Sequence, residues 1–92
     1  GVTSGASHIE RVKNCRCVIC LHRLGVNQTP CDAHHVGTGD ERDDYATASL
    51  CLEHHRGATG VHGLHRRAFE RMWKATDIML LAWTYRELAR NV

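Results

Sequence analysis

The chain has 92 residues, enough for one small domain with a thin core, because so short a chain buries only about two-thirds of its unfolded surface. Its formal charge of +2 is too mild to identify a nucleic-acid-binding protein by itself. No signal peptide or long apolar run is present, so we expect no membrane association and a cytoplasmic location. In such a chain an odd count of 5 Cys indicates metal binding in preference to disulfide bonds.

The first third of the chain predicts a short helix followed by a cysteine-rich loop. The opening GVTSGAS lacks an initiator methionine, is expected to be a truncated or appended start, and is left out of the predicted fold. Ser7 with Glu10 three positions later matches a capping box, which predicts a helix over residues 7–13. Residues 14–33 show no helical period and contain turn formers such as Gly25 and Pro30, so they predict a zinc knuckle and a loop.

Two strands are expected next, at Cys31–Val36 and Ala46–Leu50. They are joined by a polar loop whose GDERDD segment gathers the acidic residues. With the helices that follow, this order predicts one small α+β domain over residues 1–92, stabilised by zinc. Residues 15–63 form its zinc-knuckle and metal-binding core, and residues 64–90 form its C-terminal helices.

The C-terminal helices are predicted from helix-breaking residues and from the helical spacing of apolar residues. A short helix begins near Leu52 and breaks at Gly57 or Gly60, and Thr76 with its following aspartate restarts a helix. The faces predicted to pack on the core carry Phe69, Met72, Trp73, Thr76, Ile78, Leu81, Ala82, Tyr85, Leu88 and Ala89.

Four other residues fall outside these patterns. Leu80 and Trp83 lie off the predicted core face and indicate a second contact surface. His8 and His22 fit no ligand spacing, and we expect both at the surface.

The cysteines predict a structural zinc site. Zinc prefers four tetrahedral ligands, and two ligands on one tight turn need a gap of two residues. Two half-sites have this gap, namely Cys17 with Cys20 and Cys51 with His54. Cys15 could replace Cys17, and Cys31 could replace Cys51 or His54; otherwise both are packed thiols.

The remaining histidines predict a second, catalytic metal. Adjacent residues on a strand point to opposite faces, so each histidine doublet can serve two roles. In the first doublet, one imidazole can bind a metal while its neighbour acts as a base toward water. In the second, His54 can complete the zinc site while His55 faces the catalytic metal, and His62 can reach the same ion after a glycine-rich turn. His65 could substitute for His62 or lie near a phosphate.

The segments AHHVGTG, ATASLCLEHHRG and GVHG resemble the HNH (ββα-metal) endonuclease superfamily, in which a histidine doublet ends a first strand. The knuckle and the doublets are most similar to phage recombination-enhancement nucleases that depend on RecA, and to related small phage HNH proteins. The resemblance covers about Cys17 to His65. It implies a ββα-metal core and a metal-dependent DNA endonuclease, encoded by a phage or prophage and linked to recombination, with DNA and a RecA filament as partners.

The resemblance also implies a role for each histidine. His34, His55 and His62 would hold the catalytic ion, which would be Mg²⁺, Mn²⁺ or Zn²⁺, while Zn²⁺ fills the structural site. His35 would be the general base that takes a proton from the attacking water. Ala46 stands where the family often has its asparagine, so Asp44 or Thr47 is expected to take over that function.

Basic residues follow the second doublet closely. Arg56, Arg66 and Arg67 are expected to hold the DNA backbone, which gives affinity that depends on salt and not on sequence. Two alternatives remain open. One is a non-catalytic zinc module that binds nucleic acid or a protein, and the other is a toxin-type HNH nuclease, against which the mild charge argues.

Overall fold

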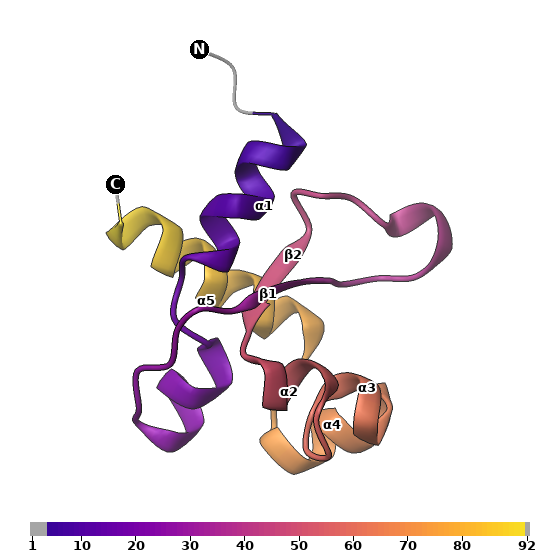
Figure 1. Cartoon of the computed structure of the whole chain (residues 1–92). Helices are drawn as coiled ribbons and strands as arrows, with labels where there is room; N and C mark the ends of the chain where they lie inside the picture. Colours follow the sequence, from indigo (N-terminus) through magenta and orange to yellow (C-terminus); the bar gives the residue numbers. More distant parts are fainter. Residues whose placement is uncertain (1–3, 92) are drawn as a thin grey trace.

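Two short antiparallel strands lie at the centre of the computed structural model, which describes residues 4–91 (Figure 1). Strand β1 spans Asp32–His35 and strand β2 spans Thr47–Leu50, close to the predicted ranges. In the register between them, Asp32 is opposite Leu50 and His35 is opposite Thr47. Because successive side chains on a strand alternate between its faces, Asp32 and His34 share one face of β1.

The α+β class is confirmed by the helices that surround this sheet (Figure 1). A π turn at Cys20–Leu24 forms the knuckle after α1, and a 3₁₀ turn at Gly39–Glu41 lies in the loop between the strands. Both α1 and α5 pack on the strands, whereas α2, α3 and α4 follow one another beyond the end of β2. The α-helices are α1 (Gly5–Lys13), α2 (Leu52–Arg56), α3 (Val61–Leu64), α4 (Arg66–Trp73) and α5 (Asp77–Arg90).

The start of α1 differs from the prediction. The helix begins at Gly5, and the N-cap is Ser4, whose Oγ accepts a hydrogen bond from the Ser7 backbone at 3.1 Å. Ser7 is therefore inside the first turn, and the predicted cap was wrong by one turn. Part of the opening segment thus belongs to the fold, because the N-terminal N–H groups of a helix need an acceptor and Ser4 supplies it.

The helix breaks after β2 were predicted correctly. Helix α2 ends at Gly57, and α5 begins after Thr76, whose side chain accepts a hydrogen bond from the Met79 backbone at 3.2 Å. Between α2 and α4 the chain folds back on itself through glycines. A Cβ at Gly63 would collide with the carbonyl of Gly57, so only glycine permits this close return of the backbone.

The core joins the knuckle to β2, α4 and α5. Its largest fully buried side chains include Phe69, Ile19, Leu50 and Leu80. The knuckle is also held to the end of α4, because Arg23 donates hydrogen bonds to the carbonyls of Trp73 at 2.7 Å and Lys74 at 2.8 Å. These carbonyls belong to the C-terminal turn, where helices lack internal donors.

The predicted core faces of α4 and α5 were only partly right. Phe69 and Leu88 are buried, but Met72 is 51% exposed, Ile78 79% and Tyr85 42%. The face of α5 that packs on the sheet carries Leu80, Trp83, Thr84, Glu87 and Leu88. Leu80 and Trp83 are thus core residues, and the second contact surface predicted from them is wrong.

Polar residues on this face explain the error. Thr84 accepts a hydrogen bond from the Ser49 backbone at 3.1 Å, so a hydroxyl is satisfied inside the core. Glu87 is 4% exposed and accepts a hydrogen bond from Nε of Arg16 at 2.8 Å. That hydrogen bond lowers the pKa of Glu87 to about 2. A core face predicted from apolar residues alone omits Glu87, because its carboxylate is buried together with its own partner, Arg16.

His8 is buried, which corrects its predicted place at the surface. Its ring lies 4.7 Å from that of Tyr45 and 5.6 Å from that of Tyr85, measured between centroids. Burial lowers the pKa of His8, which favours the neutral ring where α1 packs against these two tyrosines. His22 is exposed, as predicted, and stacks on Trp83 at 4.3 Å.

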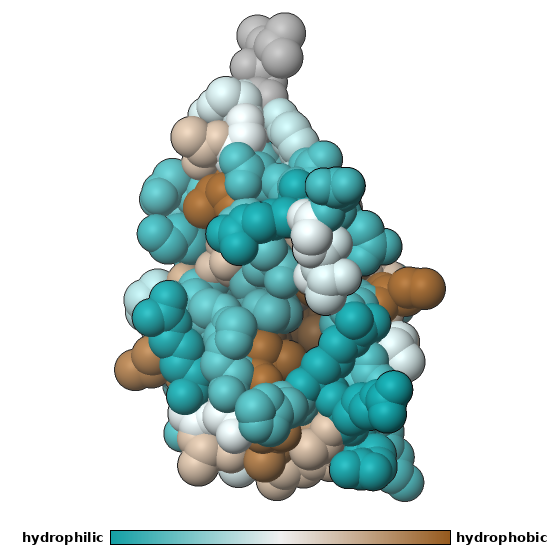
Figure 2. Space-filling model, turned by 90° about the vertical axis from the view of Figure 1, so that its right-hand side faces the viewer, coloured by the Kyte–Doolittle hydropathy of each residue, from teal (hydrophilic) through white to brown (hydrophobic). Residues whose placement is uncertain are grey.

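The molecular surface is mostly hydrophilic on the face that Figure 2 shows, and apolar side chains are scattered over it. Within residues 4–91, none of the helices has the length and apolar character required to cross a bilayer.

Candidate metal centres

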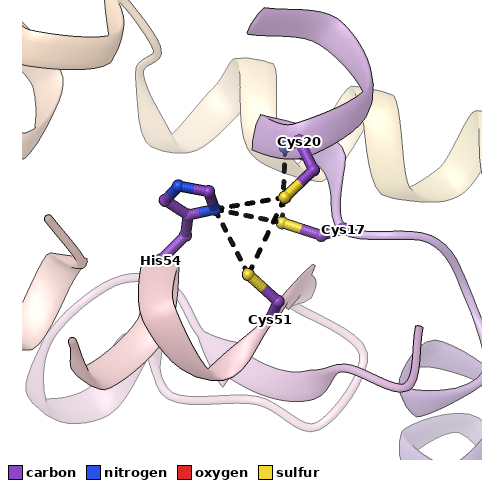
Figure 3. Close-up of side chains that lie close together, drawn as sticks. All are labelled: Cys17, Cys20, Cys51 and His54. Carbon is purple, nitrogen blue, oxygen red and sulfur yellow. Dashed lines mark hydrogen bonds between the residues drawn. The ribbon is translucent and has the colours of Figure 1, made fainter. Parts of the chain in front are cut away.

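The two predicted half-sites meet in one buried cluster (Figure 3). The segment from Cys17 into the knuckle contributes two side chains, the segment at the start of α2 contributes two, and all four point toward a common centre. They are Cys17 and Cys20 from the knuckle, Cys51 before α2 and His54 within it.

The spacing of the ligand atoms fits a tetrahedral ion. Zinc bonds of about 2.3 Å to sulfur and about 2.0 Å to nitrogen place the ligand atoms about 3.5–3.8 Å from one another. The Sγ atoms of Cys20 and Cys51 are 3.8 Å apart. From Nδ1 of His54 the sulfurs lie at 3.6, 3.4 and 3.2 Å, for Cys17, Cys20 and Cys51 respectively. This cluster could therefore bind a metal ion such as zinc.

The charge state of the thiols also favours a cation. The neighbouring Cys31 thiol, together with backbone N–H groups, lowers the pKa of Cys17 to about 4. Burial and the charge of that thiolate raise the pKa of Cys20 and Cys51. The protein alone thus stabilises one thiolate here, whereas zinc binding requires the cysteines to be ionised and compensates their charge.

Neither spare cysteine is a ligand in this geometry. Cys15 is fully buried and packs with Val12 and Leu88, away from the cluster. Cys31 is buried, and its thiol donates a hydrogen bond to the carbonyl of Gln28 at 3.6 Å. The prediction of packed thiols is therefore the better of the two alternatives.

Three more histidines form a second group beside α2. His34 comes from β1, His55 from α2 and His62 from α3, and their nearest ring nitrogens all lie within 4.8 Å of one another. Their ring centroids are 4.7–5.6 Å apart. The glycine turn before α3 brings His62 back onto α2 and completes this tri-histidine group.

A carboxylate orients one member of the group. Nδ1 of His55 donates a hydrogen bond to Oδ2 of Asp32 at 2.9 Å, since an ionised carboxylate can only accept. This fixes the tautomer and leaves Nε2 of His55 with a free lone pair. Sequence reasoning missed Asp32, although strand alternation places it on the same face as His34.

Burial favours the neutral form of two imidazoles in this group, which is the form that binds metals. Burial, followed by repulsion from the neighbouring rings, lowers the pKa of His34 to about 4. Burial, with the nearby His55 and Arg56, lowers the pKa of His62. Three imidazole ligands that leave coordination positions open are typical of catalytic metal sites, whereas four ligands are typical of structural ones.

His35 is adjacent to the group but does not belong to it. Its Nε2 donates a hydrogen bond to Oδ1 of Asp44 at 2.9 Å, which leaves Nδ1 as an acceptor. Asp44 is one of the two residues expected to replace the missing asparagine. Thr47, the other, is fully buried, and its hydroxyl donates to the carbonyl of Asp44 at 3.0 Å. Ala46 makes only backbone hydrogen bonds, to Val36 and Asp43.

Two hollows open beside the tri-histidine group, and His34, His35 and His62 line both. We name each by its arginine. The Arg42 hollow has a volume of about 400 Å³ and is lined by Ala33, His34, His35, Arg42, His55, Arg56 and His62. The Arg66 hollow has a volume of about 240 Å³ and is lined by His34, His35, Gly37, Thr38, Val61, His62, His65, Arg66 and Asp77.

The predicted DNA-binding arginines are placed unequally. Arg56 lines the Arg42 hollow and lies 4.0 Å from Asp32. Arg66 lines the other hollow, and Arg67 is exposed on α4 but lines neither of the two. His65 lies in the Arg66 hollow with a left-handed φ of 71° and is not a member of the tri-histidine group.

Comparison of the chain with protein-family models, with curated proteins and with solved structures finds no match.

Proposed function

We propose that the protein is a metal-dependent DNA endonuclease of the HNH (ββα-metal) type, which hydrolyses phosphodiester bonds. One observation supports this most directly. Three imidazoles that could hold one ion with open coordination positions stand beside a fourth imidazole, His35, whose orientation is fixed by Asp44. A metal ligand set and a positioned base in one hollow are what hydrolysis of a phosphodiester requires.

The residues divide the chemistry between them. His34, His55 and His62 hold a divalent ion, Mg²⁺, Mn²⁺ or Zn²⁺, which when bound would act as a Lewis acid on the scissile phosphate. Asp32 keeps His55 in the tautomer that can bind a metal. Asp44 accepts the Nε2 proton of His35, so Nδ1 is the atom that takes a proton from water. A base of this kind typically contributes a factor of about 10²–10⁴ to the rate.

The structural zinc has a separate task. Cys51 and His54 bracket the start of α2, and His55 is the next residue along the same helix. Zinc held by the Cys₃His cluster would fix α2 against the knuckle, and the position of His55 follows from it. The two histidines of the doublet thus serve different ions.

Plasmid and single-stranded DNA cleavage with Mg²⁺ or Mn²⁺ tests this function. We expect His35→Ala to lower the rate by about 10²-fold or more, because it removes the base. His22→Ala is the matched control, since His22 is an exposed histidine outside both hollows. Equal rates for the two variants would contradict the assigned base.

The link to recombination can be tested in the same assay. A phage nuclease that depends on RecA should cut DNA faster when a RecA filament is added, and His35→Ala should remove this activity as well. If the filament leaves the cleavage rate unchanged, the proposed nuclease activity stands and RecA is not its partner.

The alternative of a non-catalytic protein-binding module loses part of its support. It rests on the missing family asparagine, where Ala46 stands, and on Leu80 and Trp83 as a second contact surface, but both of these side chains are buried. Tight DNA binding without cleavage under either metal would still favour a module that only binds nucleic acid.

A further inference from the structure

The Arg42 hollow has the charge pattern of an anion site. Arg42 comes from the loop between the strands and Arg56 from the end of α2, and the tri-histidine group lies between them in the lining. Among residues 4–91 no carboxylate lines this hollow, although Asp32, outside the lining, lies 4.0 Å from Arg56. Two guanidinium groups without a lining acid would attract a phosphate, which Arg can contact with paired N–H donors.

The acidic loop does not neutralise Arg42, although Arg42 lies within GDERDD. Glu41 accepts a hydrogen bond from the Thr38 backbone at 3.1 Å, so it is turned back into its own 3₁₀ turn. Asp43 accepts from the Tyr45 backbone at 2.8 Å, and Asp44 accepts from His35 at 2.9 Å. Within residues 4–91, Arg42 forms no ion pair.

The Arg66 hollow differs in this respect. Arg66 lies 3.2 Å from Asp77, which lines the same hollow, and 3.7 Å from Glu70. Two carboxylates therefore compensate its charge. A phosphate in that hollow would have to compete with Asp77, and would also be repelled by it.

We propose that Arg42 and Arg56 form the two sides of a subsite for the backbone phosphates of the DNA strand. The strand then crosses the tri-histidine group on the side of the Arg42 hollow. The subsite does not distinguish one base sequence from another, because phosphate contacts position a strand without specifying its bases. This inference rests on the proposed function and assigns to Arg42 a role that its acidic neighbours conceal in the sequence.

Salt-dependent DNA binding tests the subsite. Fluorescence anisotropy with a labelled DNA duplex would be measured from 50 to 200 mM NaCl in the His35→Ala background, so that the strand is not cut. The logarithm of the binding constant falls as the logarithm of the salt concentration rises, and each lost phosphate contact makes this slope less steep by about 0.9. We expect this change for Arg42→Ala and for Arg56→Ala. The factor by which each variant binds DNA more weakly than the His35→Ala parent should then be about 3.5-fold smaller at 200 mM than at 50 mM NaCl.

Three further variants make the result specific. Arg42→Lys retains the positive charge, so its binding should depend on salt almost as steeply as that of the protein with Arg42. Arg86→Ala removes one exposed arginine of α5 outside both hollows and should leave the slope unchanged. Arg66→Ala should change it by less than half as much as Arg42→Ala, since its charge is already compensated.

The outcomes separate the inference from the function. If DNA binds and is cut by the unsubstituted chain, but Arg42→Ala behaves like Arg86→Ala, the subsite is refuted and the nuclease stands. If Arg66→Ala shows the full loss in slope instead, the strand runs through the other hollow and the inference is again wrong. Absence of both binding and cleavage in the unsubstituted chain refutes the proposed function itself.

Discussion

Removing one cysteine from the Cys₃His cluster should unfold the protein. Domains are stable by about 0.05–0.15 kcal/mol per residue, which for 92 residues is roughly 5–14 kcal/mol. A structural zinc site contributes on the order of 10 kcal/mol or more to folding. The Cys₃His site is thus comparable with the whole stability of the chain, and we expect Cys51→Ala to lose its zinc and its cooperative unfolding transition.

The structure provides a matched control for this experiment. Cys15 is also a buried cysteine, but it lies with Val12 and Leu88 outside the cluster. Cys15→Ala should keep the zinc of the Cys₃His cluster and lose about 1 kcal/mol, which lowers the melting temperature by about 4–8 °C in a domain of this size. Zinc content by atomic absorption and thermal melting by circular dichroism distinguish the two variants.

A chelator separates the contribution of zinc from that of the side chain. Stripping zinc from the unsubstituted chain should reproduce the Cys51→Ala result, and adding zinc back should reverse it. If Cys51→Ala instead melts cooperatively, at a temperature close to that of Cys15→Ala and without bound zinc, the core alone holds the fold. The reasoning about the cluster would then be wrong.

Three further predictions test other parts of the structure. Asp32→Ala should weaken Co²⁺ binding at the tri-histidine group by about 10–100-fold, measured by absorbance titration, because His55 loses its fixed tautomer; unchanged affinity would remove Asp32 from the site. Glu87 has a pKa of about 2 against the usual 4.5, so its contribution of about 2–3 kcal/mol is present above pH 4.5 and is lost as the pH falls toward 2. Urea unfolding should therefore show Glu87→Gln less stable at pH 7, with the difference disappearing in acid, and a constant difference would contradict the ion pair. Leu80→Ala should cost about 2–5 kcal/mol and Ile78→Ala less than about 1, and the reverse order would restore the face predicted from sequence.

Local spacing in the sequence was sufficient for the ligand sets. The pairs Cys17-x-x-Cys20 and Cys51-x-x-His54 each lie on one turn, so their geometry depends on few backbone angles. The same is true of the first histidine doublet, because alternation on a strand separates His34 from His35 wherever the strand packs. These residues are grouped in the structure as the spacing predicted.

The face of α5 could not be obtained in this way. Its apolar residues are compatible with more than one stripe at helical spacing, and the choice depends on which side meets the sheet. The stripe that packs includes Thr84 and Glu87, whose partners Ser49 and Arg16 come from distant parts of the chain. His8 is buried for a similar reason, between the rings of two tyrosines.

The sequence by itself thus indicated which cysteines and histidines gather into two candidate metal clusters, and it placed the two strands and the break after α2, since these depend on neighbours a few positions away. Only the tertiary structure decided which side chains support those ligands and which charges are free. Asp32 reaches His55 because β1 lies against α2, and Arg42 faces a hollow because its acidic neighbours are bound elsewhere. Contacts of this kind join distant segments, so no spacing along the chain encodes them.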